Sequence, residues 1–348
     1  MIITRTPFRI TLGGGGTDLP AYYSRHGGFI FAAGLNKYMF VYLNTPIVDD
    51  LVRVKYSETE IVEDAGQVRH TLAREALRLF QIRNGVEIIS MADVPAGTGL
   101  GSSSCYLVGL LNGLHTLCRK PAARQELAEE ACRIELDILH KPIGKQDQYM
   151  ATFGGLTVLE IDRQGRVEVG DAEIPPDVAD ELQNNILLFY TGLSRSTEDI
   201  LAAQVRRLER EEEQVTDNLH LIQEIGREIL AQLRRGNVRR FGELLDEHWR
   251  AKKELGSNIA GRRIDSLYDL ARANGAIGGK ISGAGGGGFF LFYAEEGKKQ
   301  LRAAMEAEGL REMRFRFDLE GSKVLVDLLS GEQYHSLQAR RKPAVAVE

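Results

Sequence analysis

The stretch "VPAGTGLGSSSCYLVGLL", Val94 to Leu111, joins a glycine-rich loop to an apolar run. Alternating glycines at positions 97, 99 and 101 allow the backbone amides of the loop to turn toward a ligand. The three serines that follow predict the start of a buried helix, whose free N–H groups and positive dipole end attract phosphate. A glycine turn with a serine cap is the alternative. The order of loop, serines and apolar helix favours phosphate binding.

Two better known nucleotide motifs do not fit this chain. The string GxxxxGK[ST] does not occur, and the nearest match, "NGAIGGKIS", has Asn274 in place of its first glycine and Ile281 after the lysine. The run "GAGGGG" at 283–288 has GxGxxG spacing, but it precedes a strand instead of opening a helix. The sequence therefore predicts neither a Walker loop nor a dinucleotide-binding fold.

Length and composition describe an ordinary globular protein. The 348 residues suggest two domains or one large one, and the formal charge of −5 argues against a nucleic-acid-binding surface. Without a long apolar run or a leader-like start, we expect no membrane partner and a cytoplasmic location. The three cysteines lack CxxC spacing and the seven histidines form no ligand pair, so neither disulfides nor zinc are predicted. A homodimer is one assembly that the sequence leaves open.

Strand and helix patterns alternate in a way typical of an α+β protein. Strands are predicted at 2–12, 38–43, 52–56 and 86–91, and helices at 70–84 and 122–140. A loop is predicted at 141–148, and the Pro-Pro pair at 175–176 is the best candidate boundary. Beyond it, helices are predicted at 197–235, 237–256, 262–274 and 297–308. We therefore expect an N-terminal domain over 1–175, a C-terminal domain over 176–335 and a tail over 336–348.

Two carboxylates stand out in the first half. In the predicted helix 122–140, Glu135 shares a face with Ala128, Cys132 and Leu139, while Asp137 points away. A buried carboxylate needs a cation or hydrogen-bond donors, which leaves a lysine or arginine partner and a metal ion both open. Asp147 lies in "KPIGKQDQYMATFGG", where the turn residues predict a loop that holds it at a site.

The N-terminal stretch "TPFRITLGGGGTDLP", Thr6 to Pro20, places four glycines directly after a strand. Glycine is costly in a strand, so a close approach of backbone to ligand is the usual reason for such a run. Arg9 interrupts the strand just before the glycines. Either it lies at an exposed alternating position, or it reaches toward a developing negative charge.

Taken in order, "TPFRITLGGGGTDLP", "PAGTGLGSSS" and "KISGAGGGGFF" resemble the three motifs of the GHMP kinase superfamily of galactokinases, homoserine kinases, mevalonate kinases and phosphomevalonate kinases. The resemblance covers residues 2–330. It implies a two-lobed α+β fold with the active site in the cleft between the N- and C-terminal lobes. Within the superfamily, "RTPFRITLGGGGTDLP" and "KPIGKQDQY" look most like the D-glycero-D-manno-heptose 7-phosphate kinases.

The resemblance also implies roles for individual residues. Asp147 matches the catalytic aspartate, and Arg9 matches an arginine near the transferred phosphoryl group. Ser103 and Glu135 match the Mg²⁺ ligands of mevalonate kinases, so ATP and Mg²⁺ are the expected cofactors. The residues expected to hold the ATP phosphates are Pro95, Gly97, Gly99, Leu100, Gly101, Ser102, Ser103 and Ser104. Those expected to bind the acceptor are Gly14, Gly15, Gly16, Thr17, Asp18, Arg195, Gly283, Ala284, Gly285 and Gly286.

One departure from the galactokinase pattern bears on the acceptor. Where galactokinases carry Glu-His-Thr-Asp, this chain has Gly15-Gly16-Thr17-Asp18. By this resemblance, Asp18 corresponds to the galactokinase aspartate that holds the ring hydroxyls of the sugar. Gly15 and Gly16 replace two larger residues, so we expect room there for a longer sugar. Cations for a second phosphate are sought at Arg195, Lys252 and Lys253, although helix lysines are usually solvated.

The sequence thus predicts an ATP- and Mg²⁺-dependent kinase that phosphorylates the anomeric hydroxyl of D-glycero-D-manno-heptose 7-phosphate, with a small sugar phosphate and ATP as its partners. By resemblance, the product serves the synthesis of nucleotide-activated heptose for surface polysaccharides. The alternatives are another sugar-1-kinase, acting on fucose, galactose or a uronic acid, and a non-catalytic sugar or nucleotide sensor on the same fold.

Overall fold

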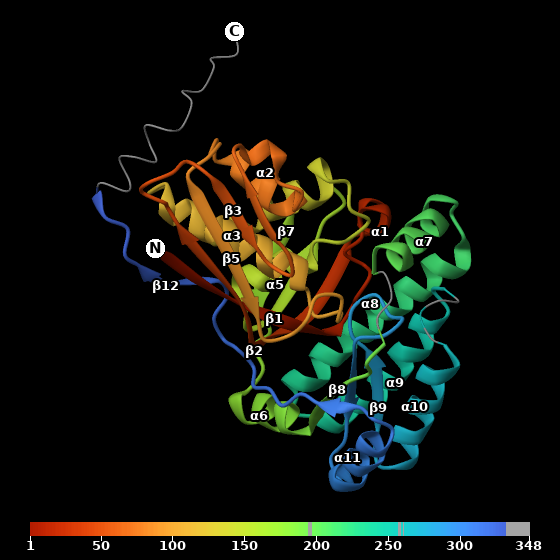
Figure 1. Cartoon of the computed structure of the whole chain (residues 1–348). Helices are drawn as coiled ribbons and strands as arrows, with labels where there is room; N and C mark the ends of the chain where they lie inside the picture. Colours follow the sequence, from red (N-terminus) through yellow and green to blue (C-terminus); the bar gives the residue numbers. More distant parts are fainter. Residues whose placement is uncertain (194–196, 257–258, 260, 332–348) are drawn as a thin grey trace.

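The chain forms two lobes (Figure 1). The structure is a computed structural model that describes residues 1–193, 197–256, 259 and 261–331. The N-terminal lobe is built on a large mixed sheet, and the C-terminal lobe on a smaller antiparallel sheet with helices beside it. This arrangement confirms the expected α+β, two-lobed fold.

The long strand β2 (Gly28–Asn44) organises the first sheet. It pairs along its length with β1 (Ile2–Gly13), with β6 (Leu156–Ile161) near its start and with β5 (Val86–Ala92) near its end. The sheet is completed by β3 (Val52–Lys55), β4 (Thr59–Val62), β7 (Val167–Asp171) and β12 (Lys323–Asp327). Of its pairings only that of β3 with β5 is parallel.

Helix α3 (Ser102–Leu117) is the buried helix that the central motif predicts. Two glycines let it lie close to the sheet, because a Cβ on Gly109 would approach the Thr6 hydroxyl to 2.8 Å and one on Gly113 would approach Leu43 to 2.5 Å. The other helices of this lobe are α1 (Pro20–His26), α2 (Thr71–Leu79), α4 (Arg124–Cys132), α5 (Gln146–Phe153), a 3₁₀ turn (Ala65–Gln67) and a π-helical turn (Arg133–Ile138).

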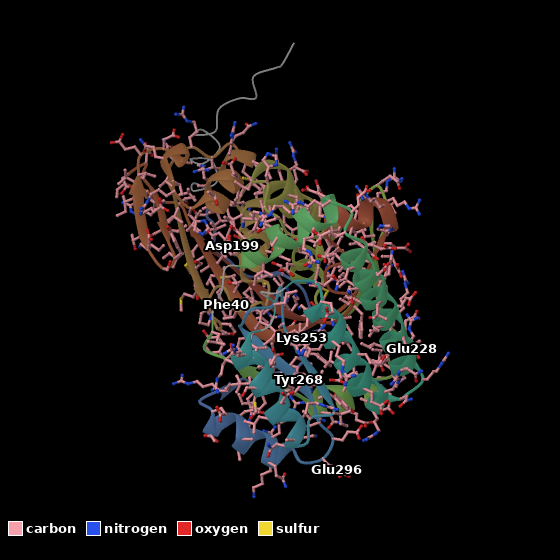
Figure 2. All side chains as sticks on the ribbon, turned by 90° about the vertical axis from the view of Figure 1, so that its right-hand side faces the viewer. Phe40, Asp199, Glu228, Lys253, Tyr268 and Glu296 are labelled. Carbon is pink, nitrogen blue, oxygen red and sulfur yellow. The ribbon has the colours of Figure 1, made fainter. Side chains whose placement is uncertain are left out.

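The second sheet has the order β11 (Arg311–Glu312), β8 (Ile186–Tyr190), β10 (Phe289–Tyr293) and β9 (Gly278–Ile281), all antiparallel. Its helices are α6 (Pro176–Asn185), α7 (Thr197–Glu209), α8 (Glu213–Arg234), α9 (Val238–Lys253), α10 (Arg262–Ala273) and α11 (Lys298–Ala307). Figure 2 shows this lobe from the side, with Lys253 and Tyr268 on its helices.

Several elements differ from the prediction. Strand 38–43 is the second half of the 17-residue β2, and helix 197–235 is divided into α7 and α8. Helix 122–140 is shorter, because it changes to a π-helical turn after Cys132 and ends at Ile138. The division at residue 175 stays a prediction, although β12, which lies beyond it, pairs with β1. Residues 332–335 and the tail fall outside the described residues.

Three further observations concern the expected classes of site. All three cysteines are buried and free. Within the described ranges, no helix has both the length and the apolar composition to cross a membrane. No group of three or more histidine, cysteine or acidic side chains that could hold a metal occurs in the part of the chain that the structure describes.

Candidate active site

A cavity of about 1270 Å³ is lined by residues of both lobes. Pockets for a single small ligand commonly enclose about 300–1,000 Å³, so this one has room for two ligands side by side. The three glycine-rich stretches each contribute to its wall. The cavity between the lobes is therefore lined by many, though not all, of the predicted site residues.

The central loop places the N-terminus of α3 at the cavity. Gly97, Gly99 and Gly101 all have φ between +76° and +84°, a region that side-chain-bearing residues rarely adopt. No side chain caps α3, so its first N–H groups are free to bind a ligand. The predicted loop residues that line the cavity are Pro95, Gly97, Gly99, Gly101, Ser102, Ser103 and Ser104. Leu100 is instead fully buried.

Glu135 is completely buried and saturated with donors. Its Oε1 accepts from the Ser103 hydroxyl at 2.7 Å and from the Lys141 ammonium at 3.0 Å. Its Oε2 accepts from the Ser104 hydroxyl and the Gln148 amide, both at 2.7 Å. Of the partners that the sequence left open for Glu135, the structure contains a lysine, Lys141, which also donates to Ser103 at 2.9 Å.

The same group suits a magnesium ion. Mg²⁺ is usually bound by one or two protein oxygens together with substrate phosphates and water. Ser103 and Glu135 supply a hydroxyl and a carboxylate oxygen 2.7 Å apart beside the free end of α3. Lys141 provides the positive charge at this pair of oxygens.

Asp147 and Arg9 form an ion pair inside the cavity. The Nε of Arg9 lies 2.7 Å from Oδ1 of Asp147, and its Nη1 donates to the Gly99 carbonyl at 2.7 Å. The arginine side chain is 4% exposed and the aspartate 27%, so the carboxylate keeps access to the cavity. Asp147 does not lie in a loop as predicted, because it occupies the first turn of α5. Gln146 Nε2 also donates to it, at 3.1 Å.

Asp18 lines the same cavity as this pair. Its carboxylate accepts from the backbone N–H of Gly16 at 3.2 Å and of Gln146 at 3.0 Å. Burial raises the pKa of Asp18, an effect that the Gln146 N–H opposes. Gly15 and Gly16 also line the cavity.

Gly14 and Thr17, which were predicted to bind the acceptor, do not line the cavity. Gly14 permits a close approach, since a Cβ there would lie 1.9 Å from the Phe29 carbonyl oxygen. The Thr17 hydroxyl is fully buried and donates to the carbonyls of Gly14 and Phe29, both at 2.8 Å. These two residues shape the loop and do not line the cavity.

The third glycine stretch contributes in part. Gly283 and Ala284 line the cavity, whereas Gly285 and Gly286 do not. Gly283 packs on the central loop, because a Cβ on it would lie 2.6 Å from the Cα of Gly99. Arg195 lies outside the described residues, so its position is not part of the site as described.

Sequence reasoning missed several residues of the cavity. Tyr56, His70 and Tyr106 form an aromatic wall, with the Tyr56 and His70 rings 4.7 Å apart. On the opposite lobe Lys252 and Lys280 line the cavity and are buried. Lys252 was predicted as a candidate cation for a second phosphate, with a solvated helix lysine as the alternative, and its burial was not foreseen. A lysine inside the apolar strand β9, directly before the third glycine stretch, was the available signal for Lys280.

Comparison with known proteins gives the family. The GHMP kinases N-terminal domain matches residues 65–155, and the GHMP kinases C-terminal domain matches residues 229–309. The D-glycero-alpha-D-manno-heptose 7-phosphate kinase of Campylobacter jejuni is 30% identical over 92% of this chain and 98% of its own length. The L-fucokinase/L-fucose-1-P guanylyltransferase of Bacteroides fragilis is 27% identical over 86% of this chain and 35% of its own.

A solved structure shows the same fold. The D-glycero-D-manno-heptose 1-phosphate kinase of Bacteroides thetaiotaomicron superposes with a TM-score of 0.78 at 24% identity, over 95% of this chain and all of that one. The chain therefore belongs to the GHMP kinases, which are ATP-dependent enzymes. More closely, it is a sugar kinase, a phosphotransferase with a hydroxyl group as acceptor.

Proposed function

We propose that this sugar kinase transfers the terminal phosphate of ATP to the anomeric hydroxyl of D-glycero-D-manno-heptose 7-phosphate. The observation that carries the proposal is the Arg9–Asp147 pair, held 2.7 Å apart beside the uncapped end of α3 in one cavity with Asp18. The similarity to the C. jejuni heptose 7-phosphate kinase over nearly the full length of both chains supports the choice of sugar.

The nucleotide phosphates are assigned to the N-terminal lobe. The free N–H groups of α3 and the amides around Gly97 and Gly99 face the cavity and suit a polyphosphate. Ser103 and Glu135 would hold Mg²⁺, which when bound neutralises charge on the phosphate oxygens. The aromatic wall of Tyr56 and His70 suits the nucleotide base.

Transfer of the phosphoryl group takes place at Asp147 and Arg9. The Asp147 carboxylate orients the attacking hydroxyl and accepts its proton as the new bond to phosphorus forms. Arg9 lies against Asp147 and reaches Gly99 of the phosphate loop, so its charge stands between acceptor and nucleotide. It stabilises the negative charge of the transferring group, which is the main demand of this reaction.

The sugar itself is assigned to the pocket around Asp18. Its carboxylate is held by backbone N–H groups, so it is positioned to accept from ring hydroxyls. Gly15 and Gly16 line the same cavity, and we assign the carbons beyond the ring of a heptose to the space beside them. The product would feed nucleotide-activated heptose and surface polysaccharide synthesis.

L-Fucose is the second candidate acceptor, because the matching region of the B. fragilis fucokinase covers 86% of this chain. The two candidate acceptors are distinguished by measuring ADP release in the presence of ATP and Mg²⁺. The sugars compared are the heptose 7-phosphate, its dephosphorylated form, mannose 6-phosphate, galactose and L-fucose. We expect kcat/KM to be highest for the heptose 7-phosphate by at least tenfold. Preference for L-fucose would contradict the proposal and leave the kinase in place.

A further inference from the structure

A cluster of basic side chains lies buried on the C-terminal wall of the cavity. Lys252 and His248 come from α9, and Lys280 comes from β9. Their exposed fractions are 8%, 1% and 2%, and all three line the cavity. Lysines of surface helices are normally solvated, so two buried lysine side chains in one place require an explanation.

No negative charge in the described part of the chain compensates this cluster. Among the described residues, Lys252 donates only to main-chain carbonyls, those of Ile281 at 3.2 Å and of Gly283. Lys280 makes no hydrogen bond or ion pair with any described residue, and both ring nitrogens of His248 are buried without a partner. A buried charge without a counterion costs several kcal/mol, so the fold keeps these lysines at the expense of stability.

The charges that surround the cluster are themselves positive. Burial and then the Arg9 guanidinium lower the pKa of Lys252 to about 7. Burial, Lys252 and Arg9 lower the pKa of Lys280 well below its usual value, and burial with the two lysines does the same for His248. Among the described residues, the one charge from outside the cluster that shifts these pKa values is the Arg9 guanidinium, and no carboxylate contributes to any of the three shifts.

We propose that Lys252 and Lys280 form a phosphate-binding site on the C-terminal wall, opposite the nucleotide-phosphate loop. The ligand class is a phosphate monoester dianion, whose two charges supply what the cluster lacks. The proposal deepens the proposed function and rests on it for the source of the phosphate. That source is either the phosphate that the acceptor already carries or the terminal phosphate of the nucleotide.

The intrinsic fluorescence of Trp249 can report binding at this site. Trp249 is the single tryptophan of the chain and is fully buried. It follows His248 directly and lies one helical turn before Lys252 on α9. An anion bound by these neighbours therefore changes the electrostatic surroundings of the indole and its fluorescence.

The test titrates inorganic phosphate into the full-length protein while Trp249 fluorescence is recorded. We expect saturable binding in the wild type, weakened at least tenfold in Lys252→Met and in Lys280→Met. Lys253→Met is the matched control, since Lys253 also neighbours Trp249 but pairs with Asp265 at 3.1 Å and does not line the cavity. Equal affinity in all four proteins, or no saturable binding in the wild type, overturns the site.

Thermal melting controls for the possibility that the lysine variants fail to fold. Removing an uncompensated buried charge should leave the melting temperature of both variants equal to or above that of the wild type, while the upward shift caused by phosphate becomes smaller. A melting temperature that falls while the shift caused by phosphate is retained would show a structural role instead, and would also overturn the site.

Steady-state kinetics then assigns the phosphate. If Lys280→Met raises KM only for a phosphorylated sugar, the site holds the acceptor phosphate. If it lowers kcat equally for phosphorylated and unphosphorylated sugars, the site holds the terminal phosphate of the nucleotide. Should the heptose 7-phosphate not be turned over at all, the proposed function fails, yet the phosphate titration still decides whether the site exists.

Discussion

Replacing Lys141 with methionine removes the one cation among the described residues that contacts the buried Glu135 carboxylate. Breaking a buried ion pair from one side costs about 3–5 kcal/mol when nothing replaces the partner. Here Ser103, Ser104 and Gln148 still donate to Glu135, and the Lys141 side chain is 17% exposed. The expected loss is therefore smaller, roughly 2 kcal/mol, close to that of one hydrogen bond to a charged group.

The loss is measured by thermal melting of the ligand-free protein. At roughly 2 °C per kcal/mol for a chain of this size, Lys141→Met should melt about 4 °C below the wild type. Lys299→Met is the control, because Lys299 is exposed on α11 and makes no ion pair with a described residue. We expect it to melt within about 1 °C of the wild type.

Magnesium should reverse the effect. With Mg²⁺ and ADP present, the metal supplies positive charge at Ser103 and Glu135, so the difference between Lys141→Met and the wild type should shrink to less than half. An unchanged melting temperature in the ligand-free variant would refute the ion-pair argument. A difference that persists undiminished with Mg²⁺ and ADP would refute the assignment of the metal to this pair.

Three further outcomes follow from the same geometry. Asp147→Asn should lower kcat by about 10²–10⁴-fold while nucleotide-induced stabilisation is kept, as measured by ADP release and melting. Gly15→Val should raise KM for the sugar at least tenfold, because its side chain enters the cavity near Thr11; Gly170→Val, with open space around it, should not. Lys252 binds a proton less tightly in the folded state, where its pKa is about 7, than when unfolded. The loss of folding stability caused by burying the Lys252 ammonium is therefore complete below pH 7 and decreases as the pH rises toward 10. Denaturant melts should show that the free energy of unfolding of the wild type increases over this interval relative to that of Lys252→Met.

Local signals predicted the centre of the fold well. The glycines and serines before α3 determine a loop and a helix start within a few residues, and the helical spacing around Glu135 was enough to expect its burial. Asp137 is exposed, as the same spacing predicts. These features depend on neighbours along the chain, which is why one sequence sufficed.

Features that depend on distant partners were missed. The first half of β2, "GFIFAAGLNK", is buried almost throughout and lacks the alternation that marks a half-exposed strand. β12 is a strand because it pairs with β1, more than 300 residues earlier. Asp147 was read as a loop residue because the helix that it begins, α5, is only eight residues long and follows several turn residues.

The burial of Lys252 and Lys280 was missed for a different reason. A lysine on a helix or strand is usually solvated, so Lys252 was only one of three candidate cations for a second phosphate, and Lys280 was passed over although it lies within an apolar strand. Only the packing of α9 on β9 brings Lys252 and Lys280 beside Arg9. Functional sites are where such departures from local expectation are concentrated.

The most direct test of the central claim is phosphorus NMR of the product formed from D-glycero-D-manno-heptose 7-phosphate, ATP and Mg²⁺. The proposed chemistry predicts two phosphate signals of equal intensity in the product, one of them coupled to the anomeric proton and absent when Asp147→Asn is used. A product without anomeric phosphate, or one formed at an unchanged rate by Asp147→Asn, would contradict it.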